Sequence, residues 1–140
     1  LALVEKHKIV AEGAGAVSVA AAMFNNADIP EGSNVGCIVS GGNIDVTILS
    51  RIINRGLMKS GRTVQLLIEM LDEPGSLLRL CDVFVKQNAN IISIYHERNG
   101  ESPDVNSCNI RVVLETRDFA HIQEITTDVT KAGYIILEQK

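Results

Sequence analysis

The strongest constraint on the fold is an alternation of apolar and polar residues that recurs between residues 62 and 138. In residues 62–70 every second residue is apolar, so one face of an extended chain would be apolar. This pattern predicts a half-buried β-strand. The residues on that face are Val64, Leu66, Ile68 and Met70. The same period returns at residues 91–98, 107–116 and 134–138, where it predicts three further strands. In the second of the four, Ile92 and Ile94 are expected on one side.

Two segments between these strands have the helical period instead. One follows the turn at residues 72–76, and its apolar positions are Leu77, Leu80, Cys81 and Phe84. The other follows the third strand, with Phe119, Ile122, Ile125 and Val129. The order βαββαβ predicts an α+β domain of the ferredoxin-like plan, with both helices on one sheet face. The other face is expected to stay free and to include Thr63, Gln65, Leu67, Ser93 and Tyr95.

Residues 99–106 contain Gly100 and Pro103 and are predicted to form a hairpin loop. The neighbouring His96 is expected on a strand, in a packing or surface role rather than a catalytic one.

Composition narrows the function classes. The chain has 140 residues, a net charge of -4 and no basic run, which argues against a nucleic-acid partner. No apolar stretch is long enough to span a membrane. Three cysteines, Cys37, Cys81 and Cys108, have no metal-like spacing and are interpreted as reduced, buried residues of a cytoplasmic protein.

The first 60 residues follow a different pattern. Residues 1–8 look like the end of a helix without a cap, so we expect the chain to be a piece of a longer one. An alanine-rich helix at 14–24, a buried parallel strand at 35–39 and a helix at 44–55 are predicted next. Because a parallel strand needs neighbours, this αβα piece is expected to be an incomplete domain, with a boundary near residue 60.

A candidate ligand position follows the predicted parallel strand. The motif Ser40-Gly41-Gly42-Asn43 places a small hydroxyl and two glycines at the carboxyl end of the strand, where open α/β sheets hold ligands. The glycines allow a close approach of the backbone. The alternative is a plain strand–helix turn with Asn43 as the helix cap.

Residues 5–16 (EKHKIVAEGAGA), followed by residues 39–45 (VSGGNID), resemble the end of the catalytic domain of threonine dehydratases, also called threonine ammonia-lyases. These are pyridoxal-phosphate enzymes of the tryptophan-synthase-β fold (fold type II). The resemblance implies that Ser40 bonds the pyridine nitrogen of the cofactor and that Gly41 lies close to its ring. It also implies that Glu12 reaches the ring edge, although Glu12 is equally compatible with a solvated carboxylate at a helix start.

The family's Schiff-base lysine and glycine-rich phosphate loop lie upstream of these motifs. We therefore expect that the 140-residue chain alone is inactive and holds no pyridoxal phosphate, although its full-length parent would.

The turn at residues 71–77 (LDEPGSL), together with residues 88–91 (NANI), resembles an ACT domain, the amino-acid-sensing module of metabolic enzymes. The resemblance implies side-by-side pairing of two copies and an amino acid bound at their interface. The implied contacts are Asp72, Gly75, Ser76 and Leu77 from one copy and Asn88, Asn90 and Ile91 from the other. The start of the helix suits a carboxylate, and Asp72 suits an ammonium group. The alternative is a turn that binds nothing.

The leading hypothesis is the C-terminal regulatory part of a threonine dehydratase, which converts threonine to 2-oxobutanoate and ammonia. Its ACT domain would dimerise and bind isoleucine or valine, with residues 56–61 as the hinge. One alternative is a non-catalytic ACT assembly module. Another is the regulatory part of a serine dehydratase or a racemase-like enzyme, because these share the Ser40-Gly41-Gly42 pattern.

Overall fold

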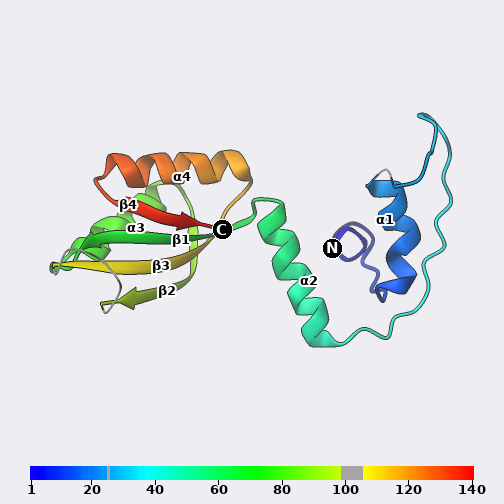
Figure 1. The fold of residues 1–140 in the computed structure, drawn as a ribbon, viewed down its shortest axis with the longest axis horizontal. Coiled ribbons are helices and arrows are strands. Elements are labelled where there is room, and N and C mark those ends of the chain that lie inside the picture. Colours follow the sequence, from blue (N-terminus) through cyan, green and yellow to red (C-terminus); the bar gives the residue numbers. More distant parts are fainter. Residues whose placement is uncertain (25, 99–105) are drawn as a thin grey trace. The chain divides into compact units, whose positions relative to one another are not determined.

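The computed structural model describes residues 1–24, 26–98 and 106–140. The chain divides into two compact units, Leu1–Arg55 and Gly56–Lys140 (Figure 1). Each unit is described by itself. None of the helices in the described ranges is long and apolar enough to cross a membrane.

The second unit has the predicted βαββαβ order. Its elements in chain order are β1 (Thr63–Leu71), α3 (Ser76–Lys86), β2 (Asn90–Glu97), β3 (Ser107–Glu115), α4 (Phe119–Lys131) and β4 (Ile135–Gln139). The strands form one antiparallel sheet in the order β2-β3-β1-β4, so β2 and β4 are its edges (Figure 1). The fold class predicted for this part of the chain is confirmed.

The core lies between one face of this sheet and the two helices. Alternate residues of β1 and β3 are buried because side chains along a strand point to opposite faces. The strands contribute Val64, Leu66, Ile68, Met70, Cys108, Ile110, Val112 and Leu114. The helices contribute Leu80, Phe84, Ile122, Ile125 and Val129. The alternation read from the sequence is therefore the pattern that builds the core.

The prediction that Ile92 and Ile94 lie on the same face of β2 is wrong. A bulge between Ile91 and Ser93 shifts the register of β2 against β3. As a result Ile91 and Ile94 pack against the core, whereas Ile92 is 52% exposed. A period-two pattern cannot reveal a bulge, because the extra residue changes which positions share a face.

In the described residues of the first unit, the regular elements are short helical segments and most of one longer helix. These are a π-helical turn at Leu3–His7, a 3-10 turn at Ala14–Ala16, α1 (Val17–Met23) and α2 (Val46–Lys59), which runs across the division between the units. The predicted strand at residues 35–39 is not formed in this structure. Among the described residues of this unit no other strand is present to pair with it, and unpaired β backbone is not stable alone.

One expectation and one alternative about this region need correction. Cys37 is exposed rather than buried, because the segment that carries it is not covered by a sheet. Helix α2 is capped by Asp45 and not by Asn43: Asp45 Oδ1 accepts the N–H of Thr47 at 2.7 Å. Hydrogen bonds from the side chain and backbone of Thr47 lower the pKa of Asp45.

Gly61, just after α2, lies against the start of α4. Its φ of +68° is in the left-handed region, and a Cβ there would lie 2.7 Å from the backbone nitrogen of Phe119. Glycine is required for both reasons.

We expect Gly61→Ala to lower the free energy of unfolding by more than about 1 kcal/mol, because both the backbone and the packing oppose the methyl group. Gly133→Ala is the matched control, since Gly133 has a φ of +91° and open space around it. Chemical denaturation of both variants measures the difference. Equal destabilisation would show that the contact with Phe119 contributes nothing.

Candidate functional site

The ACT-like turn borders a cavity of about 250 Å³ at one end of the sheet. It lies where β1 ends, α3 begins and β2 ends. Its lining residues are Met70, Asp72, Glu73, Pro74, Gly75, Leu77, His96 and Arg98. Three of the seven predicted effector contacts, Asp72, Gly75 and Leu77, are therefore brought together here.

The turn itself is held by its own backbone. The N–H of Ser76 donates to the carbonyl of Glu73 at 3.1 Å, and Gly75 adopts a φ of +87° that reverses the chain into α3. Ser76 does not line the cavity. It is buried, its hydroxyl accepts from Arg79 at 2.8 Å, and its carbonyl accepts from Tyr134.

Of the charged groups that line the cavity, the carboxylate of Asp72 and the guanidinium of Arg98 are in direct contact. Arg98 Nε lies 2.9 Å from Asp72 Oδ2, and His96 Nε2 lies 3.6 Å from Asp72 Oδ1. A negative and a positive group side by side complement the ammonium and carboxylate of a zwitterion.

Cys108 lies next to this charged group. The donor atoms of Asp72, His96 and Cys108 all lie within 4.8 Å of one another. Burial raises the pKa of the Cys108 thiol, and the nearby charge of Asp72 adds to this effect while Arg98 opposes it. Sequence reasoning placed Cys108 in the core and His96 on a strand, but it assigned neither of them, nor Arg98, to a site. The predicted ferredoxin-like plan contained the signal, because in this plan the end of β2 lies at the same end of the sheet as the turn that follows β1.

The remaining predicted contacts lie at the opposite end of β2. Asn88 adopts a left-handed φ of 54°, Asn90 donates to Glu115 at 3.0 Å, and Ile91 packs on the core. Within one chain they are therefore remote from the turn, and their role as contacts from a second copy stays a prediction.

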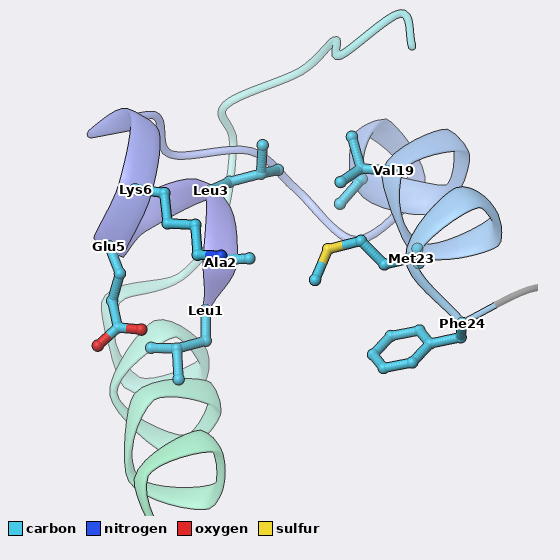
Figure 2. A pocket seen from close by; sticks show the side chains of 10 residues that line it. Leu1, Ala2, Leu3, Glu5, Lys6, Val19, Met23 and Phe24 are labelled. Carbon is cyan, nitrogen blue, oxygen red and sulfur yellow. The ribbon is translucent and has the colours of Figure 1, made fainter. Parts of the chain in front are cut away.

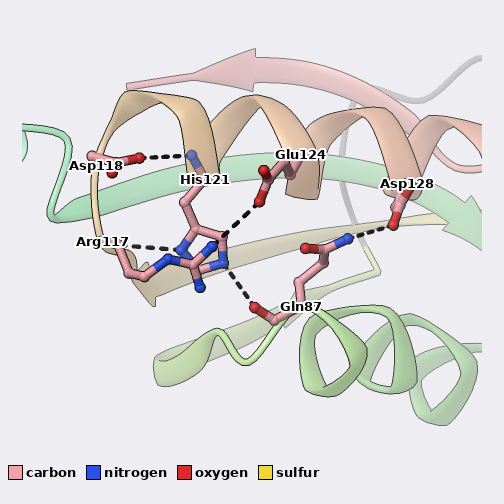
Figure 3. A network of polar contacts seen from close by, with 6 residues as sticks. All are labelled: Gln87, Arg117, Asp118, His121, Glu124 and Asp128. Atoms are coloured by element: carbon pink, nitrogen blue, oxygen red, sulfur yellow. Dashed lines mark hydrogen bonds and ion pairs between the residues drawn. The ribbon is translucent and has the colours of Figure 1, made fainter.

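A buried histidine links the two helices of the second unit (Figure 3). The Nδ1 of His121 accepts the N–H of Arg117 at 3.1 Å, which leaves Nε2 to donate to the carbonyl of Gln87 at 2.8 Å. Asp118 caps α4 by accepting the N–H of His121 at 2.9 Å. Gln87 also donates to Asp128. Every polar atom of the ring has a partner, so His121 is a structural residue.

We expect His121→Ala to lower the free energy of unfolding by about 1–3 kcal/mol, because the N–H of Arg117 and the carbonyl of Gln87 lose their partner and a buried ring is removed. Thr127→Ala, at an exposed position of the same helix, should change it by less than about 0.5 kcal/mol. Thermal and urea unfolding measure both. A His121→Ala variant as stable as Thr127→Ala would contradict the structural role.

The first unit brings the predicted cofactor residues together. The N–H of Glu12 donates to the carbonyl of Gly41 at 3.1 Å, and a methyl group on Gly15 would overlap the carbonyl of Ser40. Gly41 has a φ of +69°, and a Cβ there would lie 2.5 Å from the side chain of Glu12. The two motifs are therefore neighbours in space, and both need glycine where they meet.

The first unit contains a cavity of about 320 Å³ whose lining is mostly apolar (Figure 2). Met23 and Phe24 point toward it from the end of α1, opposite the segment that carries Leu1 and Leu3. Among the described residues that line it, Glu5 and Lys6 are the charged ones. Such a lining offers packing surface and no chemistry.

Comparison with known proteins identifies the second unit. Residues 64–130 match the ACT domain family, so the sheet with its two helices is an ACT domain. Over nearly its whole length, the chain is also similar to L-threonine ammonia-lyases. It is 42% identical to that of Thermotoga maritima over 134 residues, which is 96% of this chain and 33% of that protein. It is 40% identical to that of Geobacter sulfurreducens over 136 residues, 97% of this chain and 34% of that protein.

A biosynthetic L-threonine dehydratase of Mycobacterium bovis is 39% identical over 100 residues, 71% of this chain and 23% of that protein. The chain thus spans about a third of the length of the first two relatives. The resemblance to an ACT-bearing threonine dehydratase, drawn from two short motifs in each half, is confirmed.

Proposed function

We propose that this chain is the amino-acid-sensing regulatory part of a cytoplasmic threonine ammonia-lyase. The parent enzyme converts threonine to 2-oxobutanoate and ammonia with pyridoxal phosphate. The observation that carries the proposal is the charged cavity at the ACT turn, in a chain similar to L-threonine ammonia-lyases over 96% of its length.

The effector binds in the cavity as a zwitterion. Asp72 accepts from its ammonium group, while the start of α3 beyond Gly75 and the guanidinium of Arg98 hold its carboxylate. Leu77 contacts its side chain. A branched apolar side chain fits this lining, so isoleucine and valine are the candidate effectors.

The second half of the effector site comes from another copy of the chain. β2 is an edge strand, and the contacts missing from the cavity lie at its start while the cavity lies at its end. Two copies paired antiparallel along β2 would bring the start of one strand beside the end of the other. Asn88, Asn90 and Ile91 of one copy then face the turn of its partner.

An apolar stripe on α3 supports this pairing. Leu78 is 68% exposed and Val85 is 67% exposed, seven residues apart on one helix face, with the half-buried Cys81 between them. Ile92 and Tyr95 of the edge strand β2, which α3 contacts, are exposed as well, so this edge offers exposed apolar surface on both its helix and its strand. A second copy covers this surface.

The pairing is tested by the double variant Leu78→Asp, Val85→Asp. Because two charges would be buried at the interface, we expect it to be monomeric at concentrations where the unaltered chain is a dimer. Analytical ultracentrifugation measures both, with Ile135→Asp on the far edge strand β4 as the control. A dimer that survives the double variant would place the interface elsewhere.

The effector site is tested by calorimetric titration of the 140-residue chain with isoleucine, valine, threonine and serine. We expect saturable binding of a branched amino acid, and at least a tenfold loss of affinity in Gly75→Leu, because Gly75 is part of the cavity wall and a bulky side chain there changes the wall. Gly133→Leu, at a similar left-handed φ but away from the cavity, is the control for backbone strain.

Unchanged affinity in Gly75→Leu would overturn the site. No heat with any amino acid would favour the alternative of an ACT assembly module. Binding of serine alone would favour a serine dehydratase as the parent.

In the full-length parent, Ser40, Gly41 and Glu12 would hold pyridoxal phosphate. The fit rests on the close approach of Glu12 to Gly41, where any residue but glycine would fill the space. The cofactor supplies an electron sink for elimination of the β-hydroxyl of threonine. The neutral hydroxyl of Ser40 would accept or donate at the ring nitrogen without forcing a proton onto it. The chain alone is expected to be inactive.

A further inference from the structure

We propose that Asp72, His96 and Cys108 form a zinc-binding site at the end of the ACT sheet. Of the described residues, these are the three histidine, cysteine or acidic side chains whose donor atoms converge. They come from three different segments: the turn after β1, the end of β2 and the start of β3. The site does not depend on the proposed function.

The sheet register brings these segments together. Cys108 pairs with Met70 of β1, and the N–H of Asp72 donates to the carbonyl of Asn106 at 2.8 Å. On the other side of β3, His96 pairs with Ile110, two residues from Cys108. The backbone hydrogen bonds of β3 with β1 and with β2 therefore determine the positions of the Cα atoms of all three residues.

The spacing of the donor atoms suits a tetrahedral ion. Zinc bonds of roughly 2.0–2.3 Å place neighbouring ligand atoms about 3.3–3.7 Å apart. His96 Nε2 and Asp72 Oδ1 are already 3.6 Å apart. Because all three donors lie within 4.8 Å of one another, rotation of the Cys108 side chain and small shifts complete the set.

The donor types favour zinc over harder ions. A thiolate, an imidazole and a carboxylate are the ligands that zinc takes in proteins, whereas calcium and magnesium prefer oxygen alone. On binding, Cys108 releases its proton to solvent, and the two negative ligands neutralise the ion. Three protein ligands leave a fourth position open, and Asp72 and His96 also line the 250 Å³ cavity, so that position is reached from it.

Arg98 orients the carboxylate. Its Nε lies 2.9 Å from Asp72 Oδ2, and its Nη2 makes a longer contact of 3.4 Å with Oδ1. Oδ1 is also the oxygen that lies near His96 Nε2. Groups that bond a ligating carboxylate from outside commonly set its orientation. The side chains of Asp72 and His96 are each 31% exposed, so an ion can enter from solvent, while Cys108 at 2% forms the base.

The test is titration of the reduced 140-residue chain with Co²⁺, followed by displacement with Zn²⁺. Cobalt bound through a thiolate gives an intense near-ultraviolet charge-transfer absorption. We expect this absorption to saturate at one ion per chain and to disappear when zinc is added. Because no amino acid is present, the result is separate from effector binding.

The variants locate the site. We expect the absorption to be lost in Cys108→Ser and the cobalt affinity to fall at least tenfold in His96→Ala. His96→Ala tests the site even if Cys108→Ser fails to fold, because His96 is partly exposed and its removal leaves no buried gap. Cys37→Ser and Cys81→Ser are the matched controls and should keep the absorption.

An unaltered chain with no charge-transfer absorption, or an absorption that survives Cys108→Ser, would overturn the site. So would an unchanged cobalt affinity in His96→Ala.

Discussion

The pairing of β1 with β3 is the interaction on which the rest of the ACT unit depends. The two strands pair antiparallel from Thr63 opposite Glu115 to Leu71 opposite Ser107 without interruption. Because side chains alternate along a strand, a slip of one residue would turn the buried face of β1 to solvent. The same register places the turn after β1 beside the start of β3, so the cavity is a direct consequence of it.

The end of the sheet concentrates the chemistry of the unit. Asp72 contacts Arg98 and approaches His96, and the thiol of Cys108 lies beneath them. An amino-acid effector and a zinc ion would both use Asp72, so the two proposals are linked by one carboxylate.

The opposite end of the helical layer has a different role. Two hydrogen bonds link the end of α3 to α4 there: His121 bonds the carbonyl of Gln87, and the side chain of Gln87 donates to Asp128. Buried polar groups with complete partners rigidify the packing around them. At one end of the ACT unit, hydrogen bonds therefore hold the two helices together. The other end carries the open, charged cavity. We expect this arrangement in a rigid domain that carries a binding site.

The sequence by itself determined the order of elements in residues 62–138, the two core-facing helices and the turn at Gly75, because periodicity and turn chemistry are local properties of the chain. It also indicated the two families that the comparisons support. Tertiary structure decided the rest: the bulge that exposes Ile92, the absence of a strand at 35–39, and the meeting of Asp72, His96, Arg98 and Cys108. These depend on which backbone pairs with which, and strand pairing joins residues that are far apart in the sequence.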